Sequence, residues 1–384
     1  MKLFRLLKRF NINNIALTSL ALASVFAGCN KKSASTPPPT EFDQTAMLTN
    51  IADNLIVPAY QELSTQSDHL VTSLTQFATD PSASNLLAVQ AQFKISYKAY
   101  IHCEPYDFGP ANGTVMLINS INYWPTKSAF INSELSDNTG ISDAYVNGLG
   151  AERKGFPALG YLLFDRIHDN NAVIDSFTTS GTAERRKQFI VALARNIANN
   201  AKTVLQEWQT SYSDTFKKNT GTELNTSLSL LLNNFVAGLE TSKNKRIGIP
   251  IGRKDNFTEG DPDSLAVELP YTDFAKEMLA ETTTTLTNLY QGKSGSNDGP
   301  GFDDYAKSLN SDGAALNENI KTEFNVLQTN IAAVPSPMQT AVKADPGKTV
   351  YNCWVETKKM LVLLKVDLAA NLGILITFSD NDGD

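Results

Sequence analysis

The feature that most constrains the fold of this chain is the apolar residue found at every third or fourth position through most of its 384 residues. This spacing places apolar side chains on one face of an α-helix, where they can be buried together. Sustained two-residue alternation, which would predict β-strands, is nearly absent. The sequence therefore predicts an all-α protein, with Pro58 bending its first helix. The apolar stripes that carry this prediction are Leu48–Leu63, Leu86–Ile101, Ile190–Trp208, Leu224–Leu239, Leu316–Ile331 and Val350–Leu375.

Breaks in these stripes predict how the helices are grouped. Gly- and Asp-rich stretches interrupt them at 137–150, 252–263 and 292–301, and Asn219–Thr222 lies near the middle of the folded part. Helices joined by polar turns pack most economically as antiparallel bundles. We therefore expect two bundles packed side by side, one over 43–215 and the other over 220–384.

The N-terminus has the pattern of an export signal over residues 1–28. A basic start is followed by the apolar stretch Ile15–Gly28, which is too short to span a bilayer as a helix. Val25–Cys29 resembles a bacterial lipobox, in which the cysteine becomes the lipid-bearing N-terminus. An ordinary signal cleaved near Ala27 is the alternative. A polar, Pro-rich tether over 29–42 follows.

The lipobox predicts that a lipid on Cys29 attaches the protein to a membrane. No aspartate directly follows Cys29, which favours the outer membrane, with the folded part facing the periplasm or the cell surface. Removal of the signal takes away four basic residues and no acidic one, so the formal charge changes from −7 to −11. This negative charge excludes nucleic acid as a partner, because the phosphates would repel the protein.

Few residues have the pattern of a familiar chemical site. The chain has only three histidines, which limits histidine-rich metal sites. Asp165 and His168 are three residues apart and could share a helix face as half of a metal site. The alternative is an aspartate at a helix end beside an exposed histidine.

Two turns carry charged groups that could line a cleft between the bundles. Glu104 ends a long helix within Ile101–Pro110, and Arg253 and Lys254 end the run Arg246–Lys254, which we expect to be nonhelical. The alternative for both turns is conformational, with Gly and Pro shaping the backbone and the charges exposed or paired.

Two cysteines remain if Cys29 carries a lipid. Cys103 and Cys353 either form a disulfide, which the oxidising envelope would permit, or remain two free buried thiols.

The order and spacing of several short segments resemble the imelysin family. The resemblance covers about residues 45–384, and the closing Leu372–Asp384 is similar to the lipoprotein branch in Bacteroidetes-type bacteria. It implies a two-domain, all-helical fold with a groove between two bundles. It also implies an envelope protein linked to iron acquisition or a metallopeptidase. The segments are Asn54–Tyr60, Phe108–Pro110, Trp124–Pro125, Lys154–Phe164 and Gly248–Pro250.

The chain departs from the family at its signature, Gly-x-His-x-x-Glu. The matching residues are Gly155, Pro157 and Gly160, so the histidine and the glutamate are both missing. Neither Pro nor Gly has a side chain that ligates a metal, and no general base replaces the lost groups.

Two hypotheses follow. The first, which we favour, is a noncatalytic lipoprotein that binds a ligand or a protein partner in the groove as part of iron or haem uptake. The second is an iron-binding protein or metallopeptidase-like hydrolase that uses the replacement ligands Glu104, Asp165 and His168. The sequence leaves the cofactor unknown, and the resemblance makes iron a candidate.

Overall fold

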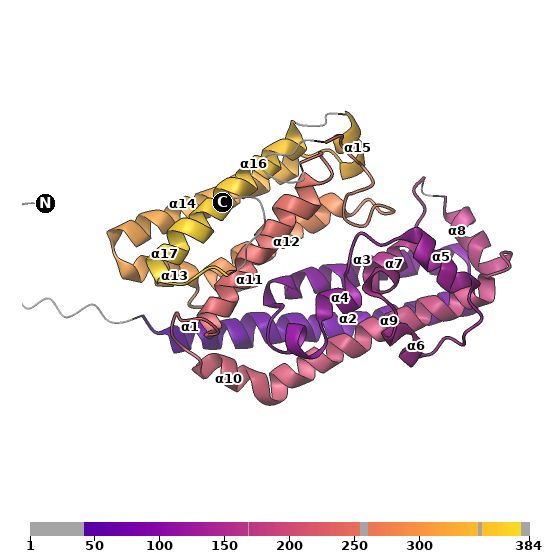
Figure 1. Cartoon of the computed structure of the whole chain (residues 1–384), viewed down its shortest axis with the longest axis horizontal. Coiled ribbons are helices and arrows are strands. Elements are labelled where there is room, and N and C mark those ends of the chain that lie inside the picture. Colours follow the sequence, from indigo (N-terminus) through magenta and orange to yellow (C-terminus); the bar gives the residue numbers. More distant parts are fainter. Residues whose placement is uncertain (1–41, 168, 254–259, 345–347, 378–384) are drawn as a thin grey trace, which may run out of the picture. The chain divides into compact units, whose positions relative to one another are not determined.

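The computed structural model describes residues 42–167, 169–253, 260–344 and 348–377, which belong to one compact unit. Helices dominate this part of the chain, so the predicted all-α fold is confirmed (Figure 1). The first elements are α1 (Gln44–Asn50), η1 (Ile51–Ile56), α2 (Val57–Thr79), α3 (Ala83–Cys103), η2 (Glu104–Tyr106), η3 (Pro110–Thr114), α4 (Leu117–Ile121), α5 (Ser128–Ser136), α6 (Asp143–Asn147), η4 (Ala151–Arg153), α7 (Gly155–Leu163), α8 (Asn170–Thr178), α9 (Ala183–Glu207), η5 (Trp208–Tyr212) and α10 (Ser213–Lys218).

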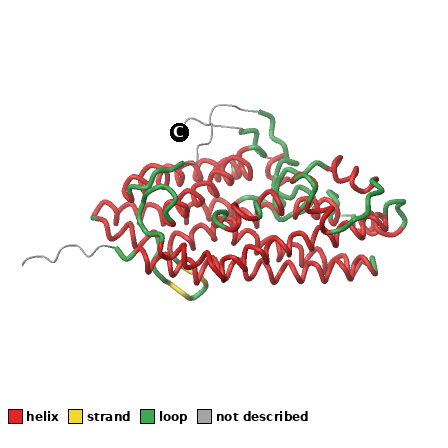
Figure 2. The backbone as a smooth tube through the Cα atoms, turned by 60° about the horizontal axis from the view of Figure 1, so that its bottom comes forward, coloured by secondary structure: helices red, strands yellow, loops and turns green. Residues whose placement is uncertain are grey.

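The later elements complete the helical part and add one small hairpin. Figure 2 shows this hairpin as a short yellow segment among the red helices. The elements are α11 (Ser227–Thr241), η6 (Ser242–Gly248), α12 (Ala275–Gln291), β1 (Lys293–Ser294), β2 (Asn297–Asp298), α13 (Phe302–Leu309), α14 (Ser311–Ala333), α15 (Met338–Ala344), α16 (Thr349–Val362), η7 (Leu363–Leu368) and α17 (Ala369–Leu372).

Several long helices contain a turn of π-helix. The first helix runs from α1 through η1 into α2, and η1 ends two residues before Pro58. Proline has no backbone N–H for the bond to the fourth residue before it, so the wider turn accommodates this gap. The structure thus shows a local widening of the helix before Pro58, and the bend expected there stays a prediction.

Contacts between helices link distant parts of the sequence. Helix α2 packs against α3 and α9, and α14 packs against α12, α13 and α16. Helix α3 also contacts α12. Along that contact, Lys98 and His102 of α3 both bond to Glu281 of α12, at 2.8 and 2.6 Å.

The buried apolar residues form two clusters. The larger cluster draws on residues from Met47 to Ile374, and the smaller one on residues from Ile247 to Trp354. Both Cys103 and Cys353 are free and buried. Of the two alternatives for these cysteines, the structure therefore has the two free thiols and not the disulfide. The division into bundles at 215–220 stays a prediction.

The prediction that Leu224 and Leu375 are buried as the end residues of their stripes is wrong. Leu224 is 53% exposed because α11 begins only at Ser227, where the Thr226 side chain caps the first turn. Leu375 is 61% exposed because Gly373, with φ +67°, ends the last helix. Among the described residues, we find no helix that is both long and apolar enough to cross a bilayer.

Candidate ligand-binding site

The sequence-predicted site residues lie in separate places. Glu104 lies at the end of α3 with its side chain 9% exposed. Asp165 follows α7 and lines a cavity with Gln90 and Lys94 of α3. The Arg253 guanidinium lies over the rings of Tyr351 and Trp354, at 5.3 and 5.7 Å from their centroids. His168 and Lys254 are outside the described residues.

Glu104 belongs to a buried polar cluster centred on Arg246. Arg246 is 2% exposed and lies in η6, so the start of the run expected to be nonhelical is helical. Its Nη2 donates to Glu104 Oε1 and to Glu268 Oε1, both at 2.9 Å, and its Nε donates to Glu268 Oε2 at 2.8 Å. The Tyr97 hydroxyl donates to Glu268 Oε1 at 2.6 Å. The alternative in which Glu104 is a paired charge therefore describes its contacts.

The charges in this cluster depend on one another. Burial works to lower the pKa of Arg246, but the charges of Glu104 and Glu268 outweigh it and raise that pKa above its ordinary value. Burial raises the pKa of Glu104 in spite of the guanidinium beside it. Breaking a buried pair of this kind leaves an uncompensated charge in a poorly solvated place.

Helix α7 carries the three motif positions and lies against this cluster. Gly155 has φ +77°, and a Cβ there would lie 2.2 Å from the carbonyl oxygen of Ile121, so only glycine fits. Phe156 packs edge-on against Tyr97, with centroids 5.2 Å apart. The side chain after the motif glycine therefore packs against an aromatic member of the cluster.

Pro157 and Gly160 line a cavity of about 370 Å³. Its walls come from two separate segments, 124–166 and 265–271, and include two aromatic residues, Trp124 and Tyr271. They also include the cations Lys127 and Arg166, and among the described residues no acidic side chain lines the cavity. The Arg166 guanidinium lies 5.0 Å from the centroid of the Tyr271 ring. The cavity thus combines aromatic surface with positive charge.

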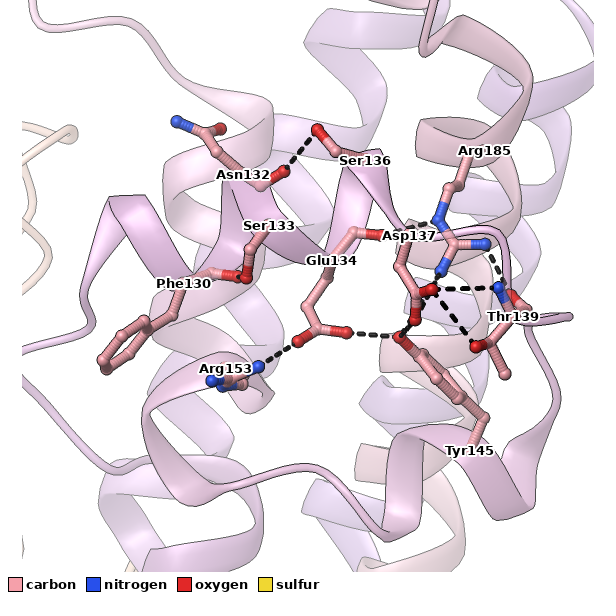
Figure 3. Close-up of polar contacts among 10 residues, drawn as sticks. All are labelled: Phe130, Asn132, Ser133, Glu134, Ser136, Asp137, Thr139, Tyr145, Arg153 and Arg185. Atoms are coloured by element: carbon pink, nitrogen blue, oxygen red, sulfur yellow. Dashed lines mark hydrogen bonds and ion pairs between the residues drawn. The ribbon is translucent and has the colours of Figure 1, made fainter.

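A polar network holds the segment that leads into α7 (Figure 3). Glu134 of α5 accepts hydrogen bonds from Arg153 and from the Tyr145 hydroxyl. Arg185 of α9 donates to the backbone oxygens of Glu134 and Thr139, at 2.5 and 2.6 Å. These contacts tie the chain around α5 and α6 to the long helix α9, and so support the segment that precedes α7.

The motif positions do not fit a metal ion. Gly160 has no side chain and Pro157 has only an apolar ring, so no ligating atom lies at either position. Over the described ranges, no three His, Cys, Asp or Glu side chains gather closely enough to hold an ion. Of the predicted replacement ligands, Asp165 lines a cavity together with Lys94 of α3, whereas Glu104 lies ten residues further along that helix. At 1.5 Å per residue, ten residues correspond to about 15 Å along the helix axis. These two carboxylates therefore do not share a site.

This fold, with its motif helix and adjoining cavity, defines a class of all-helical proteins. The family model for Imelysin matches residues 56–353, so the chain belongs to the imelysin family and the resemblance is confirmed. The curated relative "Iron-regulated protein A" of Synechococcus elongatus is 21% identical over 347 residues, which cover 87% of this chain and 86% of that protein.

Two solved structures share the fold. One is a putative iron-regulated protein A precursor from Parabacteroides distasonis, with 16% identity and a TM-score of 0.69, covering 88% of this chain and 97% of that one. The other is an imelysin-like protein from Psychrobacter arcticum, with 18% identity and a TM-score of 0.69, covering 88% and 99%.

Sequence reasoning missed the partners that meet around Arg246. Glu268 and Tyr97 belong to no motif, and Arg246 stands 142 residues from Glu104. The one available signal was a cation directly before the apolar and glycine-rich run Ile247–Gly252, where an exposed charge would be out of place.

Proposed function

We propose that the protein is a noncatalytic binding protein of the envelope that takes part in iron or haem uptake. The observation that carries the proposal is the cavity beside Pro157 and Gly160. The residues that replace the family's histidine and glutamate are small or apolar, and they leave space where the family would place two ligating side chains.

The lining of the cavity indicates the chemistry of the ligand. Lys127 and Arg166 favour a negatively charged ligand, and Trp124 and Tyr271 favour one with a planar, aromatic part. Haem has both features, because its flat ring carries two carboxylates. The name of the Synechococcus elongatus relative, "Iron-regulated protein A", supports a link to iron.

The proposal includes an anchor and a partner. A lipid on Cys29 would hold the protein at the outer membrane, facing the periplasm or the cell surface, and 29–42 would act as the tether. A protein of the uptake system is the proposed partner that delivers or receives the ligand. The support for the anchor is the lipobox-like run that ends at Cys29.

Haemin titration of the full chain tests the ligand site, with binding followed by calorimetry. The informative variant is Gly160→Glu. A Cβ at Gly160 meets its nearest atoms, on Leu269 and Phe93, at ordinary contact distances of 3.5 and 3.6 Å, and Gly160 lines the cavity, so glutamate at this position adds a negative charge to the cavity wall. We expect haemin to bind the parent chain and to bind the variant at least about tenfold more weakly, because a negative charge occupies its place.

The matched control is Gly181→Glu, since a Cβ at Gly181 meets no atom within 4 Å. It adds the same charge and should leave the affinity unchanged. Absence of haemin binding to the parent chain, or equal binding by the two variants, would contradict the proposed site.

A further inference from the structure

Another cavity, of about 350 Å³, lies where η6 packs against α16. Tyr351 and Trp354 of α16 form an aromatic wall, with ring centroids 5.6 Å apart. Val355, Leu361 and Val362 of the same helix form an aliphatic wall. Ligand cavities in proteins have volumes in this range and mostly apolar or aromatic linings with a few polar groups. The cavity therefore has the size and the walls of a small-molecule site.

The charged groups of the lining are all cations. Lys243, Lys358 and Lys359 line the cavity, and no acidic side chain of the described residues does. The chain as a whole carries a formal charge of −7, so the lining is opposite in sign to the protein's net charge. A cleft lined by charges of one sign concentrates ligands of the other sign. The lining thus favours an anion.

Lys358 is the lysine whose charge is most accessible to a ligand. Its Nζ lies 4.7 Å from the centroid of the Trp354 ring, and it forms no ion pair within the part of the chain that the structure describes. An ammonium group is attracted to the face of an indole ring, which holds it in place without neutralising its charge. Lys358 therefore brings a positioned positive charge to the cavity.

The other two lysines have carboxylate partners outside the lining. Lys243, with a side chain only 1% exposed, pairs with Glu240 at 2.9 Å. Lys359 pairs with Glu356 at 2.8 Å. These pairs reduce what the two lysines contribute to the attraction of an anion, so we expect the contribution of Lys358 to be the largest.

The backbone of η6 holds the aromatic wall closely. A Cβ at Gly248 would lie 2.7 Å from the carbonyl oxygen of Lys243 and 3.4 Å from Trp354 Nε1, so no larger residue fits without a shift. The Arg253 guanidinium, which lies over both rings of this wall, adds a second contact from the segment after η6. The wall is therefore formed before a ligand arrives, which lowers the cost of binding.

The cation and the aliphatic wall together indicate a ligand with a charged head and an apolar body. We propose that this cavity binds a single-chain amphiphilic anion, whose carboxylate or phosphate pairs with Lys358 and whose body lies against the aliphatic wall. A single chain can enter a cavity of this size, whereas the flat surface of a bilayer cannot. The site uses no residue of α7 and does not depend on the cavity beside Gly160.

Calorimetry on the full chain tests the site. Sodium decanoate and decyl phosphate are titrated separately, so that the experiment distinguishes a carboxylate head from a phosphate head. Octyl glucoside is the uncharged comparison. We expect at least one of the two anions to bind with one-to-one stoichiometry, and octyl glucoside to bind at least about tenfold more weakly, because it lacks the charge that pairs with Lys358.

The informative variant is Lys358→Gln, which removes the charge and keeps a side chain of similar length. It should weaken binding of the anion at least about tenfold. Lys202→Gln is the matched control, because Lys202 pairs with Asp68, at 2.7 Å, and does not line the cavity. This control should leave the affinity unchanged.

A second variant, Val362→Asp, adds a negative charge to the aliphatic wall and should also weaken binding of the anion. Val362 is 56% exposed, so aspartate is tolerated there. Val326→Asp on α14 is its control, since Val326 is 36% exposed and does not line the cavity. Thermal unfolding verifies that each variant is folded, and Val362→Asp carries the test if Lys358→Gln does not fold.

Silence for both anions would overturn the proposal, and so would equally tight binding of octyl glucoside or unchanged affinity in every folded cavity variant. Gly160→Glu should bind the anion as the parent chain does. Loss of binding in Gly160→Glu together with full binding in Lys358→Gln would place the anion in the cavity beside Gly160 and would also overturn the proposal.

Discussion

At the scale of single residues, the most consequential group is the buried guanidinium of Arg246. It bonds to Glu104 and Glu268 and is 2% exposed, so it is the common partner of two carboxylates that have little contact with water. A buried ion pair adds little stability over an apolar replacement, but loss of one member is costly. Arg246 is therefore needed mainly because its partners are present.

We predict that Arg246→Met lowers the free energy of unfolding by about 3–5 kcal/mol, because Glu104 and Glu268 become uncompensated buried charges. Urea unfolding at pH 8, where carboxylates ionise, measures the change. Arg195→Met is the control, since Arg195 forms an exposed pair with Asp143 and should cost less than about 1 kcal/mol. Equal losses in the two variants would show that the cluster carries no special energetic weight.

At the scale of elements, packing of α14 against α16 brings two carboxylates together. Burial and then a hydrogen bond to Glu356 raise the pKa of Glu323 to about 7. The neighbouring Lys359 donates to Glu356 Oε2 at 2.8 Å and helps to keep that carboxylate ionised. The proton held between the two helices is therefore on Glu323 at acidic pH.

This arrangement predicts a pH dependence of stability. The pKa of Glu323 is higher in the folded chain than its ordinary value of 4.5, so the folded state binds more protons between about pH 4.5 and 7. Its contribution is complete below pH 4.5 and is lost as the pH rises through 7. We expect Glu323→Gln to match the parent chain at pH 4 and to be more stable at pH 8 by about 1 kcal/mol, after allowance for solvent screening.

Thermal unfolding from pH 4 to pH 8 measures this difference. Glu318→Gln on the same helix is the control, because the Glu318 side chain is 71% exposed. The difference in stability between this variant and the parent chain should be small. A constant difference between Glu323→Gln and the parent chain at all pH values would rule out titration of Glu323 as the cause.

At the scale of the whole molecule, the proposed function joins a membrane anchor to an acidic helical body. The anchor rests on Cys29, and the body would carry a formal charge of −11 once residues 1–28 are removed. The tether between them is polar and rich in proline, which favours an extended spacer. Such a design would keep the body near a membrane while leaving its ligand site accessible.

We predict that Cys29→Ser moves the protein from the membrane fraction to the soluble fraction of cells that express the full chain. The reason is that a lipid chain contributes about 0.8 kcal/mol per buried CH₂ to membrane binding, and serine cannot carry it in the same linkage. Fractionation with immunodetection measures the distribution. Cys103→Ser is the control and should stay with the membrane. Retention of Cys29→Ser there would refute the anchor.

Features that depend only on residues close together in the sequence were predictable from the sequence. The apolar stripe Ile190–Trp208 is buried as expected, because helical spacing by itself places these side chains on one face. The missing ligands at Pro157 and Gly160 were also readable, since side-chain chemistry is a property of the residue. Leu224 and Leu375 show where this reasoning fails, because a cap or a left-handed glycine ends a helix before the apolar pattern ends.

The sequence by itself thus determined the helical class, the family and the loss of the metal motif. Only the tertiary structure decided that Arg246 meets Glu104, 142 residues away, that Asn122 comes close to Tyr100, and that Trp124 and Tyr271 line the cavity beside Gly160. The physical reason is that helix periodicity is a local property of the chain. These long-range contacts instead depend on how whole helices pack against one another, and the spacing of residues within one helix does not predict that packing.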